Sequence, residues 1–548
     1  MVLQIHDVQR VHPTIWQCSQ GVERIVSPFY RVFFKMLSSC SSYLYLCPVR
    51  GVIARQSLWA SVINYAGSAV GLFTTFYLFP LVYTVAENGI IRMFIEVGAL
   101  LAGVAQMGTG YSIWKFFPRF KNEEKGHHGV GFWLLLIPFI GFLLVTFALL
   151  FFKPQVVAYL EINSSAFLEH YHLLIPFIFF FGYNTVLEVF SASLGNILYS
   201  SFIRENVVRI LLGLIGFVFY LSWIDFDIAV KLTPAVYALA AFLNLWFVLR
   251  STRLSFLPDF GHISGQPGLK KEFSVYTGYL FLTYLANLFI QRLDFVMISA
   301  LDGLVATGVY SIAVNMAVII EIPTRSILQI SNPVLSDAMH RGDKAEMKRL
   351  YQKTTLNQFI IGAIVLLMIW VNIDLFYHWM PNGEKYEPGK WAVLILGLGK
   401  LCMLLQGNSS AMLIFSHRYY LSLIINAACL FAGILLNNYM IPLYGIEGAA
   451  AATAFVWLLG AIITGTIIWF MFRLNPYNSK VLIMAGLLAG LLIFISMVKI
   501  SPVFWLDLLL KNVLIVSSTI FVLLKFKLSE DIESMGRKLL SKFGMVKP

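Results

Sequence analysis

The chain has 548 residues, of which 59% are hydrophobic and only 12% carry a charged side chain, and its mean hydropathy is +0.77. Soluble domains contain about 25% charged residues, so this composition excludes a large soluble protein and indicates an all-α polytopic membrane protein. The net charge of +12 would suggest nucleic acid in a soluble protein, but basic residues gathered in cytoplasmic loops explain it better, and we expect no nucleic-acid partner.

Residues 1–50 differ from the rest of the chain because they contain no apolar run long enough to cross a membrane. They also lack the basic start, apolar centre and small-residue cleavage site of a signal peptide. Two interpretations stay open: a native N-terminal extension, or an upstream start-codon assignment ahead of a membrane protein that begins near Gly51. We assign no function to this segment.

From Ser57 onward, fourteen apolar runs are long enough to be transmembrane helices, because a helix needs about 20 residues to cross the bilayer. The expected spans are 57–83, 90–112, 130–152, 171–195, 205–224, 230–250, 274–298, 303–331, 355–377, 389–414, 418–440, 446–472, 479–498 and 502–525. Lysine and arginine concentrate in alternate loops, which predicts that both termini are cytoplasmic.

The spans predict an N-lobe at 51–250 with spans 1–6, a cytoplasmic linker at 251–273 and a C-lobe at 274–472 with spans 7–12. Spans 13–14 and a basic cytoplasmic tail occupy 473–548. A weak internal repeat supports two six-helix lobes, because Glu87-Asn-Gly-Ile-Ile-Arg92 opens the second span as Ala306-Thr-Gly-Val-Tyr310 opens the eighth. The loop at 332–354 predicts an amphipathic helix on the cytoplasmic surface.

Several charged residues lie inside the apolar runs, where a charge costs from about 3 to more than 10 kcal/mol unless it finds a partner, water or a polar ligand. The candidates are Arg92, Glu96, Arg292, Asp294, Glu321, Arg325 and Lys400. Two pairs, Arg92–Glu96 and Glu321–Arg325, have the spacing of four that lets side chains meet on one helix face, so each pair is either structural or cavity-lining. Arg292 and Lys400 have no acid at that spacing and are the better candidates for a polar cavity. Arg209, near the inner end of the fifth span, is expected to reach toward the interface.

Several motifs, in order along residues 51–525, resemble the polysaccharide transporter branch of the multidrug/oligosaccharidyl-lipid/polysaccharide (MOP) exporter superfamily, that is, O-antigen-type flippases of lipid-linked oligosaccharides. The matching motifs are Phe79-Pro-Leu81, Glu87-Asn-Gly-Ile-Ile-Arg92, Lys115-Phe-Phe-Pro-Arg-Phe-Lys121, Arg292-Leu-Asp294, Gly308-Val-Tyr-Ser311, Glu321-Ile-Pro-Thr-Arg325 and Tyr444-Gly-Ile-Glu-Gly-Ala-Ala450. The resemblance implies two six-helix lobes around a central cavity, two further C-terminal helices, alternating access and a place in the bacterial inner membrane.

A polyprenyl-pyrophosphate head group needs cations along a polar path, and the planar guanidinium suits phosphate oxygens. We therefore expect Arg92, Arg292 and Lys400 to bind substrate. The other four candidates, Glu96, Asp294, Glu321 and Arg325, are expected to act in gating or ion coupling, with proton, sodium and membrane potential all left open. No metal site, cofactor or ATP-binding motif is expected. Lipid-linked oligosaccharide, membrane lipids and polysaccharide-assembly proteins are the expected partners.

Two other functions stay open. A multidrug or peptidoglycan-precursor exporter would share the fold, although a drug exporter typically lacks the two additional helices and the cationic cavity. A membrane polysaccharide polymerase or ligase would place catalytic residues in a substantial outer loop. No expected outer loop exceeds about twenty residues, so we expect a transporter rather than an enzyme.

Overall fold

The computed structural model describes residues 63–525 except 123, 125, 195–196, 260–268, 478, 499 and 502. Every regular element in this part is a helix. Through residue 251 the elements are a helix at Ile63–Val82 that contains η3 (Thr74–Leu78) and α4 (Phe79–Val82), then α5 (Val85–Ala105), α6 (Thr109–Phe120), η4 (Gly126–Gly129), α7 (Val130–Phe151), α8 (Lys153–Glu169), η5 (Tyr171–Leu173), α9 (Leu174–Ser193), α10 (Ile197–Phe202), η6 (Ile203–Val207), α11 (Val208–Tyr220) and α12 (Phe226–Ser251).

The remaining described elements are α14 (Leu269–Leu301), α15 (Leu304–Ile319), α16 (Ile322–Arg341), α17 (Lys344–Trp379), η7 (Gly383–Lys385), η8 (Glu387–Gly389), α18 (Lys390–Leu404), α19 (Ser409–Phe415), α20 (Tyr420–Phe472), α21 (Ser479–Met497) and α22 (Phe504–Lys525). The segment 1–50 and the basic tail beyond residue 525 lie outside the described residues.

Within the described residues, each of the fourteen expected spans overlaps one or more helices. Among the described residues, ten helices are long and apolar enough to cross a membrane, and two bent helix pairs raise that number to twelve. Expected spans eleven and twelve share α20, which is broken at Gly445, where φ is 55° and ψ is −132°. The expected fifth span, 205–224, begins inside the π-helical turn η6, which carries Arg204 and Glu205, and continues as α11.

The second helix of each predicted lobe is broken near its middle or inner end. Between α5 and α6, Met107 and Gly108 have φ values of 48° and 74°, a left-handed conformation that glycine adopts without strain. Between α15 and α16 the chain bends by 44° just before Glu321. Pro323 follows in the first turn of α16, where its missing N–H removes no helical hydrogen bond.

The expected surface helix at 332–354 is wrong. Its first part continues α16 and its last part continues α17, and the two are joined by a tight turn at Gly342, with φ of 68°. Asp343 caps α17 by accepting a hydrogen bond from the Glu346 N–H at 3.0 Å. The polar sequence between two apolar runs favours a separate surface helix when the chain is read alone, because only Gly342 and Asp343 indicate the turn between α16 and α17.

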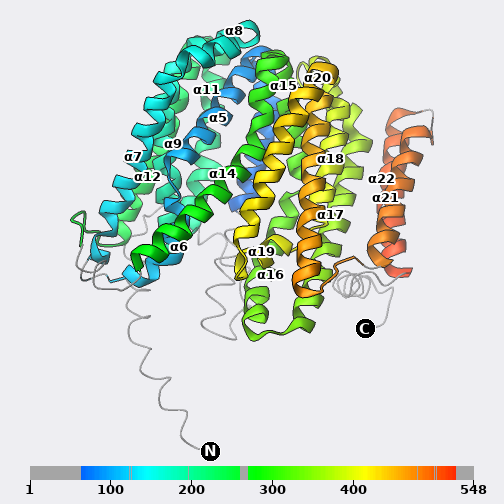
Figure 1. Ribbon diagram of the computed structural model, residues 1–548. Coiled ribbons are helices and arrows are strands. Elements are labelled where there is room, and N and C mark those ends of the chain that lie inside the picture. Colours follow the sequence, from blue (N-terminus) through cyan, green and yellow to red (C-terminus); the bar gives the residue numbers. More distant parts are fainter. Residues whose placement is uncertain are drawn as a thin grey trace, which may run out of the picture. The chain divides into compact units, whose positions relative to one another are not determined.

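Buried apolar residues form two large clusters. One includes Phe94, Phe177 and Tyr237, from α5, α9 and α12, and the other includes Tyr310 and Leu366, from α15 and α17. Helix α14 packs against α20 and also against α5, as Figure 1 illustrates. The division into an N-lobe and a C-lobe remains a prediction.

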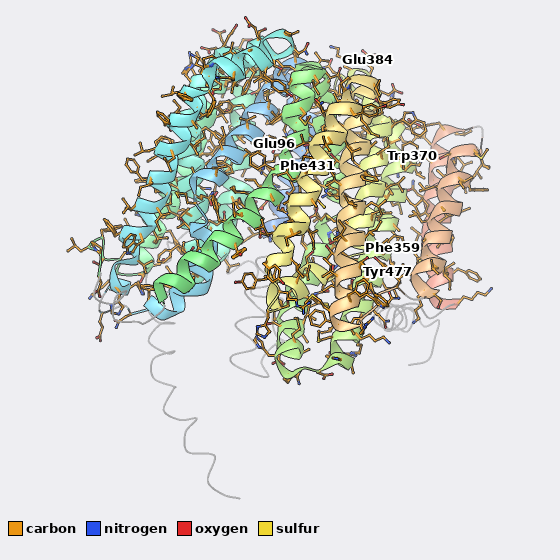
Figure 2. The ribbon with its side chains drawn as sticks, viewed as in Figure 1. Glu96, Phe359, Trp370, Glu384, Phe431 and Tyr477 are labelled. Carbon is orange, nitrogen blue, oxygen red and sulfur yellow. The ribbon has the colours of Figure 1, made fainter. Side chains whose placement is uncertain are left out.

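Polar side chains attach the last two helices to α17. The side-chain amides of Asn372 and Asn512 donate to each other at 3.0 and 3.1 Å. Trp370, labelled in Figure 2, donates its indole N–H to the Ser496 hydroxyl at 3.1 Å. Such pairs are favourable within a membrane because the alternative there is an unsatisfied amide in hydrocarbon.

Two glycines allow α5 and α15 to cross in contact. A Cβ added at Gly89 would overlap the carbonyl oxygen of Leu304, and one added at Gly308 would overlap that of Val85. The two contacts are reciprocal, because each glycine meets the residue that lies four positions before the other glycine. The repeated Gly-led helix starts at the second and eighth spans therefore meet each other (Figure 1).

Candidate functional site: two intramembrane charge clusters

The first cluster is centred on Glu96, a residue on α5 that is 5% exposed and is labelled in Figure 2. Helix α5 begins with a capping box in which the Thr84 hydroxyl accepts from the Glu87 N–H while the Glu87 carboxylate accepts from the Thr84 N–H. Arg92, one turn before Glu96, forms an ion pair with it at 2.7 Å. Arg292 of α14 donates to the other carboxylate oxygen, so Glu96 joins α5 to α14.

This Glu96 cluster has two cations for one carboxylate and keeps unused donors. The Nε atoms of Arg92 and Arg292 are both buried and find no acceptor among the described residues. Arg92 also lies over the Phe295 ring, with its Cζ 4.9 Å from the ring centroid. A guanidinium presents five N–H donors, so the two arginines together have donors left over for an anionic oxygen.

Asp294 lies two residues beyond Arg292 on α14 but takes no part in an ion pair within the described residues. It is 4% exposed and accepts hydrogen bonds from the Tyr310 hydroxyl at 2.7 Å, the Phe295 N–H at 2.9 Å and the Thr453 hydroxyl at 3.4 Å. All three donors are uncharged. A buried carboxylate with only neutral donors can take up a proton or meet a cation without first losing an ion-pair partner.

The second cluster is centred on Glu321, at the bend between α15 and α16. Lys400 of α18 donates to one of its carboxylate oxygens at 2.8 Å, and Arg325 of α16 donates to the other at 3.3 Å. Lys400 is 8% exposed and its Nζ lies 4.3 Å from the centroid of the Trp457 ring, whereas Arg325 is exposed. This Glu321 cluster also has two cations for one carboxylate.

Six of the seven sequence candidates thus form two groups, centred on Glu96 and Glu321, while Asp294 is hydrogen-bonded only to neutral donors. The pairs Arg92–Glu96 and Glu321–Arg325, expected from their spacing, are both present. Arg292 and Lys400 have no acid three or four positions away on their own helix, yet each contacts an acid from another helix. Contacts between residues this far apart in the sequence cannot be predicted from the spacing of neighbouring residues.

Sequence reasoning missed the neutral and aromatic partners. Tyr310 and Thr453 hold Asp294, and the rings of Phe295 and Trp457 cover cations. The available signal was the occurrence of Tyr310 in the Gly-led start of the eighth span. The hydroxyl and aromatic groups look like ordinary membrane-helix residues when the chain is read alone.

The charges at the inner end of the fifth span form a third, neutral group. Arg204 binds both Glu188 and Glu205, and Arg209 binds Glu205 at 2.7 Å. Arg209 also donates to the Gly67 carbonyl oxygen at 2.6 Å. Arg209 is therefore ion-paired to Glu205 and hydrogen-bonded to the first helix, and its expected reach toward the interface remains a prediction.

No group of three or more His, Cys, Asp or Glu side chains within the described part of the chain is arranged to hold a metal ion.

Comparison with known proteins identifies the fold. Residues 280–439 match the MatE family model. The lipid II flippase MurJ in an inward closed conformation superposes with a TM-score of 0.66 at 14% identity, over 85% of this chain and 98% of that one. The inward-facing conformation of a MATE multidrug resistance transporter gives 0.55 at 14% identity, over 78% and 99%. The comparison with curated protein sequences gives no match.

A third solved structure, a MOP superfamily transporter from Pyrococcus furiosus reported to have a binding pocket of reverse polarity, gives a TM-score of 0.54 at 14% identity, over 77% of this chain and 96% of that one. Identities this low establish the fold and not the substrate. The chain therefore has the helical fold of these solved MOP superfamily transporters, and its residues 280–439 match the MatE family model.

Proposed function

We propose that this protein is a flippase that moves a polyprenyl-pyrophosphate-linked oligosaccharide from the inner to the outer leaflet of the bacterial cytoplasmic membrane, for the biosynthesis of O-antigen, lipopolysaccharide or a similar surface polysaccharide. One observation carries the proposal. The Glu96 cluster and the Glu321 cluster each place one more positive than negative charge within the membrane-spanning helices. Such charges are costly in hydrocarbon unless an anionic ligand shares them.

The chemistry of the two clusters suits a pyrophosphate. Arg92 and Arg292 have buried, unused Nε–H groups, and a guanidinium binds phosphate oxygens through two parallel N–H groups. Lys400, held between Glu321 and Trp457, supplies a further cation at a second position along the path. Arg92, Arg292 and Lys400 are therefore the proposed substrate-binding residues, while the isoprenoid tail stays in lipid.

The same contacts suggest how alternating access operates. The Glu96–Arg292 pair joins α5 to α14, and the glycine crossing joins α5 to α15, so both must separate when the outer side opens. An incoming pyrophosphate competes with Glu96 for Arg292 and so weakens the closed state. Asp294 is the proposed ion-coupling residue because its partners are neutral, and Glu321 with Arg325 is the proposed gate at the bend of α16.

A peptidoglycan-precursor exporter is the second candidate, favoured by the similarity to the lipid II flippase. A multidrug exporter fits less well. The multidrug transporter aligns over nearly its whole length with only 78% of this chain. A membrane polymerase or ligase is not favoured by any arrangement of the described residues. Both termini are proposed to be cytoplasmic, with polysaccharide-assembly proteins as partners.

Reconstitution into liposomes tests the proposal. Purified protein is expected to move a fluorescent lipid-pyrophosphoryl oligosaccharide between leaflets, measured by the fraction that becomes accessible to an impermeant quencher. Lipid II and cationic dyes serve as competing substrates in parallel vesicles. Movement of dyes without movement of the oligosaccharide lipid would show that the proposal is wrong, and movement of lipid II alone would favour the second candidate.

A further inference from the structure

Near the C-terminal ends of three helices, a cation lies over the ring of the aromatic residue four positions before it. Arg250 lies over Trp246 at the end of α12, with Cζ 5.0 Å from the ring centroid, and Arg473 lies over Trp469 at the end of α20, at 5.1 Å. At the end of α22, the Nζ of Lys525 is 5.4 Å from the Phe521 ring. These helices hold the sixth, twelfth and fourteenth expected spans, so all three ends reach the same membrane face.

The rings belong to the lipid-facing surface. Trp246 is 44% exposed and Trp469 is 45% exposed, and each has an exposed apolar neighbour next to or near the cation, Leu249 in one pair and Phe470 in the other. Tryptophan is enriched at membrane–water boundaries, where its ring faces lipid and its polar edge meets head groups. The two Trp–Arg pairs therefore lie at the depth of the phospholipid head groups.

Cations at the opposite ends of the same helices have different partners. At the start of α12, Lys231 is paired with Asp227, and at the start of α22, Lys511 is paired with Asp507 at 2.9 Å. In contrast, no carboxylate of the described residues lies within 4.0 Å of Arg250 or Arg473, and none of these residues accepts a hydrogen bond from either guanidinium. The cations near the starts of α12 and α22 are therefore neutralised by carboxylates, whereas Arg250 and Arg473 are not.

We propose that Trp246–Arg250 and Trp469–Arg473 are binding sites for the head groups of anionic phospholipids. Stacking on an aromatic ring uses the face of a guanidinium and leaves its in-plane N–H groups free to donate to phosphate oxygens. The exposed rings and their apolar neighbours meet the acyl chains of the same lipid, which a free phosphate ion would not supply. The C-terminal ends of both helices add a favourable environment for the cation, which keeps it at this depth.

Native mass spectrometry of the full chain in detergent measures the binding. Phosphatidylglycerol is titrated into delipidated protein, with phosphatidylcholine as the zwitterionic control. A basic residue near an anionic surface contributes enough for about a fivefold change in affinity, so Arg250→Gln and Arg473→Gln should each weaken phosphatidylglycerol binding about fivefold, and the double variant about 25-fold. Phosphatidylcholine binding should stay unchanged.

Two variants serve as matched controls. Lys231→Gln removes a helix-end cation that is already paired with a carboxylate, so its phosphatidylglycerol affinity should equal that of the native protein. The double Arg→Lys variant keeps the charge and loses the planar stack, and it should recover part of the affinity. The proposal is overturned if the double Gln variant binds phosphatidylglycerol as tightly as the Lys231→Gln protein does. It is also overturned if inorganic phosphate protects the protein from thermal unfolding as well as phosphatidylglycerol does. Neither outcome depends on what the protein transports.

Discussion

Replacing Gly308 with alanine should push α5 and α15 apart. The added Cβ would lie 2.2 Å from the Val85 carbonyl oxygen, and it has to retreat by about 1.2 Å to reach ordinary contact at 3.4 Å. Alanine favours a helix over glycine by roughly 0.5–1 kcal/mol, so the clash is the only unfavourable contribution. Overpacking of this size typically costs about 1–3 kcal/mol, and the helix preference of alanine offsets part of that cost, so we expect a net loss of stability in the lower half of the range.

Gly308→Ala should also weaken the crossing of α5 and α15 that we propose keeps the outer side closed. Gly89→Ala meets the Leu304 carbonyl oxygen at the same crossing, so the double variant should lose less than the two single losses together, because one separation relieves both clashes. In a cysteine-free background, Ser311→Cys reports access, since Ser311 is 2% exposed one turn beyond Gly308. Gly308→Ala should speed its labelling by an impermeant maleimide added from the outer side.

Gly486→Ala is the matched control, because nothing lies within 4 Å of a Cβ added at this helical glycine of α21. It should leave the unfolding midpoint and the labelling rate unchanged or raise the midpoint slightly. If Gly308→Ala and Gly89→Ala behave like Gly486→Ala in both measurements, the glycine crossing does not hold the outer side closed and the reasoning is refuted.

Three further predictions concern single contacts. Glu96→Gln leaves two partly buried arginines without their carboxylate, and thermal unfolding in detergent should show a loss toward the lower end of about 3–5 kcal/mol, with an unchanged midpoint counting against the cluster. A double-mutant cycle of Asn372→Ala and Asn512→Ala should give a coupling of about 0.6–1.7 kcal/mol, and purely additive losses would mean that the amide pair does not attach α22. Burial lowers the pKa of His170, so as pH falls the unfolded chain takes up a proton at this residue before the folded chain does. The free energy of unfolding should therefore fall as pH drops below 6.5. His170→Gln should flatten that pH dependence, and a variant profile identical to the native one would contradict the prediction.

The sequence alone predicted the fold well because long apolar runs and loop charges are strong local signals. Within the described residues, each of the fourteen expected ranges overlaps helices, even where α20 joins two of them and where the fifth begins inside η6. The prediction of a separate surface helix at 332–354 was wrong because the helix pattern continues through most of this segment and only Gly342 marks the turn.

The candidate residues could be predicted because a charge inside an apolar run is costly in hydrocarbon. Their ion-pair partners on other helices could not be predicted in this way. The Arg92–Glu96 contact lies within one helix turn and follows from spacing. Arg292 reaches Glu96 across 196 positions of sequence, and Lys400 reaches Glu321 across 79, so both depend on how the helices pack. Their substrate-binding role remains a prediction.

The central claim, that the surplus cations in the membrane carry a pyrophosphate head group, has one direct test. Flipping of a fluorescent lipid-pyrophosphoryl oligosaccharide in liposomes is compared among the native protein, Arg292→Ala, Lys400→Ala and the control Lys231→Gln, at matched protein incorporation. We expect Arg292→Ala and Lys400→Ala each to reduce the flipping rate at least tenfold, since removing a charge-assisted phosphate contact loses roughly 1.5–3 kcal/mol. Native rates from both variants would contradict it.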